Sequence, residues 1–111
     1  MTGQDLIRER DEIKKALDKS MKKMYQNGVD FAEKQRTYRV ALAQKILVLK
    51  SEGEKTTIIE KIAKGDEDIA QLEMEQNIAE VLYKSSIENI MIQKKLLDSV
   101  EDEIKREWNR N

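Results

Sequence analysis

The sequence predicts an all-α protein: an antiparallel hairpin of two long helices with a short helix at the tip, coiled-coil-like, that oligomerises into a helical bundle. The chain has no proline and only four glycines, so little in it interrupts a helix. Charged residues make up 39% of the chain, above the ~25% of average globular domains. Apolar residues recur with alternating spacings of four and three along two long segments. We therefore expect residues 1–111 to form a single helical-hairpin domain.

The first long helix is predicted over residues 4–50. Its stripe of positions spaced by four and three consists of Leu6, Arg10, Ile13, Leu17, Met21, Met24, Gly28, Phe31, Gln35, Tyr38, Leu42, Lys45 and Leu49. Such spacing favours left-handed pairing with another helix. Asn27-Gly28 is the candidate position for a break, after which Asp30 would cap a second piece. Because the spacing keeps its phase across this site, we expect a continuous but weakened helix.

A turn and a short helix over residues 56–63 follow. Gly53 suits the left-handed position just past a helix end. Thr56 or Thr57 is expected to cap the short helix, and Lys64-Gly65 to end it. Extra apolar residues near this tip are expected to add to the closed end of the hairpin: Val40, Ala43, Ile46, Leu47 and Val48.

The second long helix is predicted over residues 67–108, with Asp66 as its N-cap. Its stripe consists of Ile69, Leu72, Gln76, Ala79, Tyr83, Ser86, Ile90, Gln93, Leu97, Val100 and Ile104, with Trp108 nearby as a lid. The short connection makes the long helices antiparallel. With the chain reversing near residue 59, the expected opposite pairs are Leu42 with Gln76, Gln35 with Tyr83, and Leu17 with Val100.

The second long helix also carries apolar residues beside its main stripe, which predicts an oligomer interface. The candidate interface residues are Ile78, Leu82, Ile87, Met91, Ile92 and Leu96. An apolar arc wider than one stripe is typical of a helix that packs against more than one neighbour. We expect a homo-oligomer, most simply a dimer; another protein using the same surface is the alternative. Polar stripe residues are expected to set the register: Gln35, Gln76, Ser86 and Gln93.

No catalytic residue, cofactor site or metal site is predicted, and we expect the chain not to be an enzyme. It has no Cys and no His, which removes thiolate ligands and the common catalytic triads. Its glycines do not form a phosphate-binding loop. The acidic residues Asp66, Glu67, Asp68 and Glu73 are interpreted as favourable charges at a helix N-terminus rather than as metal ligands.

A basic stretch suggests nucleic-acid binding as an alternative function. It consists of Lys14, Lys15, Lys19, Lys22 and Lys23, with Tyr25 close by; Lys34, Arg36 and Arg39 form a weaker cluster. The simpler interpretation is a solvated helix face, because Asp11, Glu12 and Asp18 are interspersed with the lysines. Residues 1–64 have a net charge of +5 and residues 65–111 of −6. We interpret this asymmetry first as charge pairing across the hairpin.

The chain has no apolar run of the ~18–20 residues needed to cross a membrane, and residues 1–10 have no apolar signal-peptide core. A cytoplasmic location is therefore expected, with no membrane partner.

Short sequence elements between Tyr38 and Trp108 resemble small helical proteins of phages and prophages of Gram-positive bacteria. They are Tyr38-Arg39-Val40-Ala41-Leu42-Ala43, Glu52-Gly53, Thr56-Thr57, Ala63-Lys64-Gly65-Asp66, Ile69-Ala70, Leu72, Ala79, Tyr83, Glu88 and Trp108. The resemblance covers about two-thirds of the chain and carries no catalytic residues. That family is often encoded near replication and recombination genes. The resemblance implies an accessory scaffold or adaptor in phage DNA metabolism within the bacterial host cell. A nucleic-acid-binding accessory and a virion assembly chaperone are the alternatives.

Overall fold

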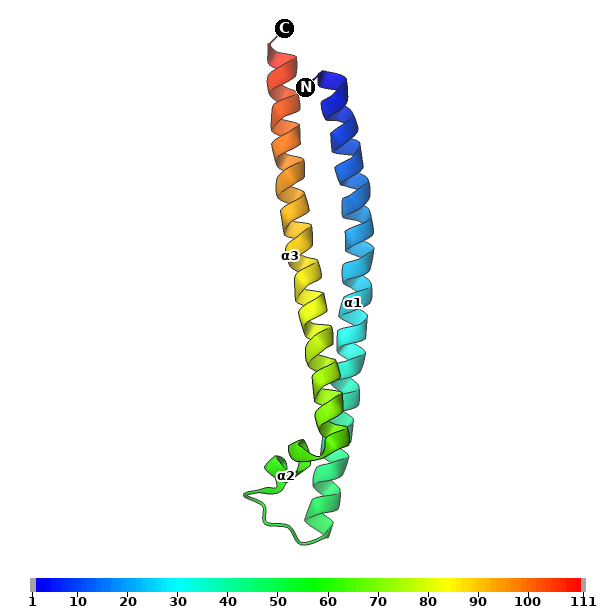
Figure 1. Cartoon of the computed structure of the whole chain (residues 1–111), viewed down its shortest axis with the longest axis vertical. Helices are drawn as coiled ribbons and strands as arrows, with labels where there is room; N and C mark the ends of the chain where they lie inside the picture. Colours follow the sequence, from blue (N-terminus) through cyan, green and yellow to red (C-terminus); the bar gives the residue numbers. More distant parts are fainter. Residues whose placement is uncertain (1, 111) are drawn as a thin grey trace. The chain divides into compact units, whose positions relative to one another are not determined.

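The structure is a computed structural model that describes residues 2–110, and all its regular elements are helices. They are α1 (Gly3–Ser51), α2 (Ile59–Gly65) and α3 (Glu67–Asn109), and Figure 1 shows their order. The predicted fold class, a helical hairpin with a short helix between two long ones, is confirmed. The long helices each extend one residue beyond the predicted C-terminal bound. The single-domain organisation stays a prediction.

The residues pack as two compact units, and both α1 and α3 pass through both of them. The tip unit consists of residues 27–83 and contains all of α2. The terminal unit consists of the described residues outside that range, 2–26 and 84–110. In each unit a segment of α1 runs antiparallel to a segment of α3 (Figure 1).

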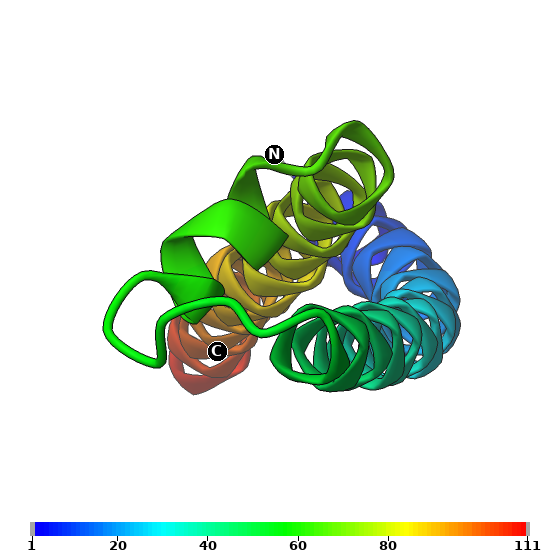
Figure 2. The same cartoon turned by 90° about the horizontal axis from the view of Figure 1, so that it is seen from below.

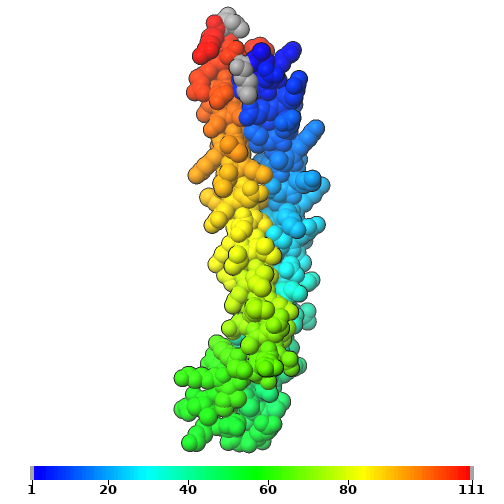
Figure 3. Space-filling model, in the orientation of Figure 1, coloured from blue at the N-terminus to red at the C-terminus, as the bar shows by residue number. Residues whose placement is uncertain are grey.

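The terminal unit is held by a small apolar core near the chain ends. Leu6 packs with Val100 and Ile104, and all three are at most 9% exposed. Ile7 and Ile13 pack against this core. In the space-filling view, the blue segment of α1 meets the orange and red segment of α3 along this unit (Figure 3).

A capping box begins α1. The backbone N–H of Asp5 donates to Thr2 Oγ1 at 3.2 Å, and the backbone N–H of Thr2 donates to Asp5 Oδ2 at 3.4 Å. This exchange satisfies backbone donors that a helix start leaves without partners. The pKa of the Asp5 carboxyl is lowered, mainly by its hydrogen bonds from Thr2. The spacing of Thr2 and Asp5 was a usable sequence signal that the sequence analysis missed.

Helix α1 continues through Asn27-Gly28, as expected, and Asp30 lies inside it rather than at a cap. In the tip unit the ring of Tyr83 lies over Gly28: a Cβ placed on Gly28 would be 3.0 Å from Tyr83 Cε1. The same ring lies 6.2 Å from the ring of Phe31, centroid to centroid. Gly28 therefore gives space to an aromatic side chain of the opposite helix, which explains a glycine in the pairing stripe.

The predicted register between the long helices is wrong, and at Tyr83 the displacement is one heptad. Tyr83 was expected opposite Gln35, yet it lies against Gly28, seven residues earlier. In the terminal unit, Val100 and Ile104 both pack with Leu6, whereas Val100 was expected opposite Leu17, eleven residues further along α1. Both stripes repeat every seven residues, so a displacement of seven again sets stripe against stripe. Periodicity alone does not distinguish these registers.

The turn after α1 is only partly as predicted. Gly53 has the expected left-handed backbone, with φ of +84°. The expected cap at Thr56 or Thr57 is wrong: α2 begins at Ile59, and its N-cap Ile58 makes no side-chain capping bond. The backbone N–H groups of Ile58 and Ile59 instead donate to the carbonyl of Lys55, at 3.1 and 3.2 Å. A backbone turn therefore replaces the capping side chain and delays the helix by three residues.

Helix α2 packs on the last turns of α1 and lies beside the end of that helix in Figure 2. Figure 1 shows that these turns of α1 extend beyond the start of α3. Ile59 and Ala63, 3% and 0% exposed, form a core cluster with Leu49. Leu42 and Ile46 pack against the cluster. The short helix thus occupies the length of α1 that the predicted register had assigned to α3.

Asp66 caps α3 as predicted. Its Oδ1 accepts the backbone N–H groups of Asp68 at 3.0 Å and of Ile69 at 3.2 Å. Its other carboxylate oxygen lies 3.4 Å from Lys45 Nζ. The pKa of the Asp66 carboxyl is lowered mainly by the hydrogen bond from the Ile69 N–H, and further by Lys45. Lys45, a fault in the apolar stripe, therefore ties α1 to the start of α3.

The expectation that the extra apolar residues of α1 help to close the tip is wrong for most of them. Ile46 is half-buried, but Val40, Leu47 and Val48 are 49%, 65% and 48% exposed, and Ala43 is also exposed. Helix α2 has seven residues and covers only one side of α1. These residues therefore form outward apolar surface on α1.

Candidate interaction surfaces

No helix within residues 2–110 is long and apolar enough to cross a membrane. The same residues contain no group of three or more Asp, Glu, His or Cys side chains placed to hold a metal ion. The surfaces that stand out are apolar or strongly charged helix faces.

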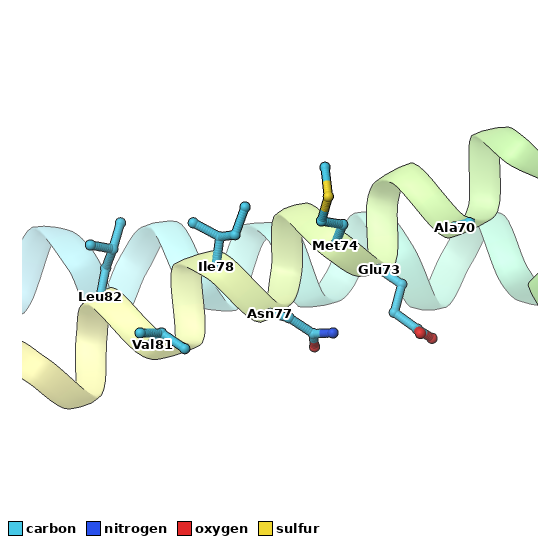
Figure 4. A pocket seen from close by; sticks show the side chains of 7 residues that line it. All are labelled: Ala70, Glu73, Met74, Asn77, Ile78, Val81 and Leu82. Carbon is cyan, nitrogen blue, oxygen red and sulfur yellow. The ribbon is translucent and has the colours of Figure 1, made fainter.

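One of these surfaces is an apolar one on α3 in the tip unit, and we call it the α3 patch: Ala70, Met74, Ile78, Val81 and Leu82. Each member lies three or four residues from at least one other member, which puts them on one side of a helix. Four are large and well exposed: Met74 by 49%, Ile78 by 53%, Val81 by 63% and Leu82 by 52%. Together with Glu73 and Asn77 they line an open groove of about 410 Å³. In Figure 4 the side chains of Met74, Ile78 and Leu82 project to the same side of α3.

The charged residues of the α3 segment that carries the patch are all acidic. Residues 67–83 contain five acidic and no basic residues: Glu67, Asp68, Glu73, Glu75 and Glu80. Glu73 turns toward α1, where its Oε2 accepts a hydrogen bond from the hydroxyl of Tyr38. This hydrogen bond, with burial and the nearby negative charge, raises the pKa of Tyr38 to about 12. The patch is therefore apolar in its centre and negative in its surroundings.

A second exposed stripe lies on α1 in the tip unit, and we call it the α1 face: Arg36, Val40, Ala43, Leu47 and Lys50. All five residues are exposed, and their spacing alternates four and three. Arg36, Val40 and Gln44 line a shallow groove there. Residues 34–50 contain five basic and no acidic residues: Lys34, Arg36, Arg39, Lys45 and Lys50. The charge of the segment that carries the α1 face is thus opposite to that of the segment that carries the α3 patch.

The candidate interface residues from the sequence fall into two sets. Ile78 and Leu82 belong to the α3 patch. Ile87, Met91, Ile92 and Leu96 lie in the terminal unit, where Ile87 is half-buried and the other three are 52–58% exposed. Ala70, Met74 and Val81 complete the α3 patch but were not among the candidates, although Met74 and Val81 lie four and three residues from Ile78, which was a readable signal.

The five lysines predicted as nucleic-acid contacts are all exposed on α1 in the terminal unit: Lys14, Lys15, Lys19, Lys22 and Lys23. Lys19, Lys22 and Lys23 line one hollow together with Gln93 of α3, and Lys15 lines an adjoining one. Lys14 lines neither hollow. Gln93 Oε1 is buried and accepts no hydrogen bond among the described residues. Three of the five lysines are therefore gathered around one concave surface.

Comparisons with protein-family models, with curated proteins and with solved structures find no match to this chain.

Proposed function

We propose that this chain is a protein–protein interaction module, a scaffold or adaptor that works by packing the α3 patch against a partner and that forms homo-oligomers, most simply dimers. The observation that carries the proposal is the cluster of Met74, Ile78, Val81 and Leu82, each about half exposed or more on one side of a single helix. Contiguous exposed apolar surface of this kind is costly in water and typically marks an interface.

The test is the solution mass of the wild-type protein and of Ile78→Glu, measured by sedimentation velocity. We expect the wild type to sediment as an oligomer and Ile78→Glu as a monomer, because a carboxylate placed among the apolar side chains of the contact would lose its hydration on burial. Helix content by circular dichroism should be unchanged, since Ile78 is 53% exposed.

Tyr25→Glu is the matched control, because Tyr25 is an exposed apolar residue of the other unit, 72% exposed. It should keep the wild-type mass. A wild type that is monomeric at all concentrations, and binds no protein through the patch, would contradict the proposal.

The cellular setting of this module is also a proposal: an accessory role in phage DNA replication or recombination, in the cytoplasm of a bacterial host. Its support is the sequence resemblance over residues 38–108. The genes that flank the coding sequence test it. Replication or recombination genes are expected there, whereas capsid or tail genes would favour the virion assembly chaperone.

Nucleic-acid binding is the second candidate function, favoured by the hollow lined by Lys19, Lys22 and Lys23. Fluorescence anisotropy with single- and double-stranded oligonucleotides tests it across a range of salt concentrations. Phosphate contacts would give an affinity that falls steeply with salt. Changing these three lysines to Gln should then weaken binding, whereas the same change at Lys94, Lys95 and Lys105 serves as the charge-matched control.

A further inference from the structure

We propose that the partner of the α3 patch is the α1 face of a second copy of this chain. The inference rests on the proposed function and adds to it the identity of the opposing surface. The two surfaces lie on different helices, so the contact joins unlike surfaces, α3 of one copy with α1 of another.

Charge is the first argument. The two segments that carry these surfaces, 67–83 and 34–50, each have 17 residues; one holds five acidic and no basic residues, and the other five basic and no acidic. Packing α3 on α3 of a second copy would bring like charges together, which is unfavourable, whereas packing it on α1 pairs opposite charges.

This charge is only partly used within one copy. Lys45 forms an ion pair with Asp66, and Tyr38 donates its hydroxyl to Glu73. Arg36 and Arg39 are exposed, and among the described residues neither forms an ion pair. Basic groups thus remain on α1 to face a negative surface from outside.

Side-chain size is the second argument. The α1 face carries the smaller side chains Val40 and Ala43 at its centre, whereas the α3 patch has the larger side chains of Met74, Ile78 and Leu82 as well as Ala70 and Val81. Both follow spacings of three and four, as in helices that interlock side chains with the gaps of a neighbour. Leu47, 65% exposed, completes the apolar part of the α1 face.

The test uses one variant for each surface, Ile78→Glu for the α3 patch and Leu47→Glu for the α1 face. Each variant alone should be monomeric by sedimentation velocity, with wild-type helix content. An equimolar mixture should form a 1:1 dimer, because Leu47→Glu supplies an intact patch and Ile78→Glu supplies an intact face. Labelling each variant with a different fluorophore and measuring energy transfer between them would detect the mixed dimer.

Val48→Glu is the matched control, since Val48 is 48% exposed on the same turn of α1 but outside the spacing of the α1 face. It should keep wild-type association. Arg36→Glu combined with Arg39→Glu should weaken association about tenfold and make it less sensitive to salt.

The outcomes separate this inference from the function on which it rests. If Ile78→Glu abolishes association but Leu47→Glu does not, the α3 patch meets a different surface, and only this inference is overturned. If the wild type does not self-associate, this inference fails even where the patch binds another protein. If Arg36→Glu with Arg39→Glu removes oligonucleotide binding and leaves association unchanged, the α1 face serves nucleic acid instead.

Discussion

Gly28 shows how one residue can be unfavourable for its own helix and favourable for the contact between helices. Glycine inside a helix costs about 1 kcal/mol relative to alanine. The ring of Tyr83 nevertheless lies so close that a methyl group on Gly28 would be 3.0 Å from its Cε1. Local helix propensity and packing therefore oppose each other at this position.

Gly28→Ala is expected to give little or no stabilisation in the wild type, because the Tyr83 ring must shift. In the Tyr83→Ala background the ring is absent, and the same change should stabilise the protein by about 1 kcal/mol. Urea unfolding of the four proteins of this double-mutant cycle measures the difference. An equal effect of Gly28→Ala in both backgrounds would show that the ring does not constrain residue 28.

Tyr38 gives the protein a pH dependence in the alkaline range. Its folded-state pKa of about 12 lies above the ordinary value of 10.0, so the folded state holds the phenol proton more tightly than the unfolded state does. The stability from this group is complete below pH 10 and is lost as the pH rises toward 12.

Tyr38→Phe should therefore lower the free energy of unfolding by about 1 kcal/mol at pH 7, the typical contribution of one hydrogen bond. The difference from wild type should shrink between pH 10 and 12. Urea titrations over this range measure it, and Tyr25→Phe at the exposed Tyr25 is the control. A difference that stays constant to pH 12 would rule out the proton of Tyr38 as its cause.

Residues whose role is local were largely predictable. The N-cap at Asp66 and the left-handed Gly53 follow from side-chain chemistry and backbone sterics within a few positions. The Thr56 or Thr57 cap failed because a turn closed by backbone bonds to Lys55 competes with it, and that competition depends on where α2 docks. The contact between Gly28 and Tyr83 could not be predicted, because it depends on the register between α1 and α3, which neither residue determines.

At the scale of the element, α2 depends on a single apolar side. Ile59 and Ala63 are buried against Leu49, whereas Ile62 is 38% exposed. A helix of seven residues is too short to be stable by itself in water, so this packing is what maintains it.

Ile59→Ala should consequently destabilise the protein by about 2–3 kcal/mol, since it removes buried methyl groups and leaves a cavity. Hydrogen exchange should show residues 59–65 losing protection first. Ile62→Ala, the same chemical change at an exposed position of α2, should cost much less. Equal costs for the two variants would mean that α2 does not pack as described.

The two long helices could be predicted to within one residue at each end, but the start of α2 and the register of the long helices could not. Helix bounds depend on prolines, glycines and caps, which the sequence displays. The register depends on which heptad of α1 meets which heptad of α3, and each stripe is nearly as good a match after a shift of seven. Docking of α2 on Leu49, together with the Lys45–Asp66 ion pair, decides between the alternatives.

For the whole molecule, the sequence correctly indicated surplus apolar surface but not its distribution. It pointed to α3 alone, because the apolar residues of α1 near the tip were assigned to the core. The charge difference between the halves was interpreted as pairing within the hairpin. Helix α1 carries both apolar and basic groups on its exposed side, namely Val40, Leu47, Arg36 and Arg39. This arrangement follows from the three-dimensional packing and not from the sequence pattern.

The docking of α2 also has a consequence for how the tip unit folds. The apolar stripes of α1 and α3 also match when one helix is shifted by seven residues. During folding, the chain can therefore form a second register of similar energy. In that alignment α3 would lie along the part of α1 that Ile59 and Ala63 cover, so the short helix would have to leave. Helix α2 therefore disfavours the shifted register, because that register requires its displacement from α1. Without α2, the two registers would have similar free energies.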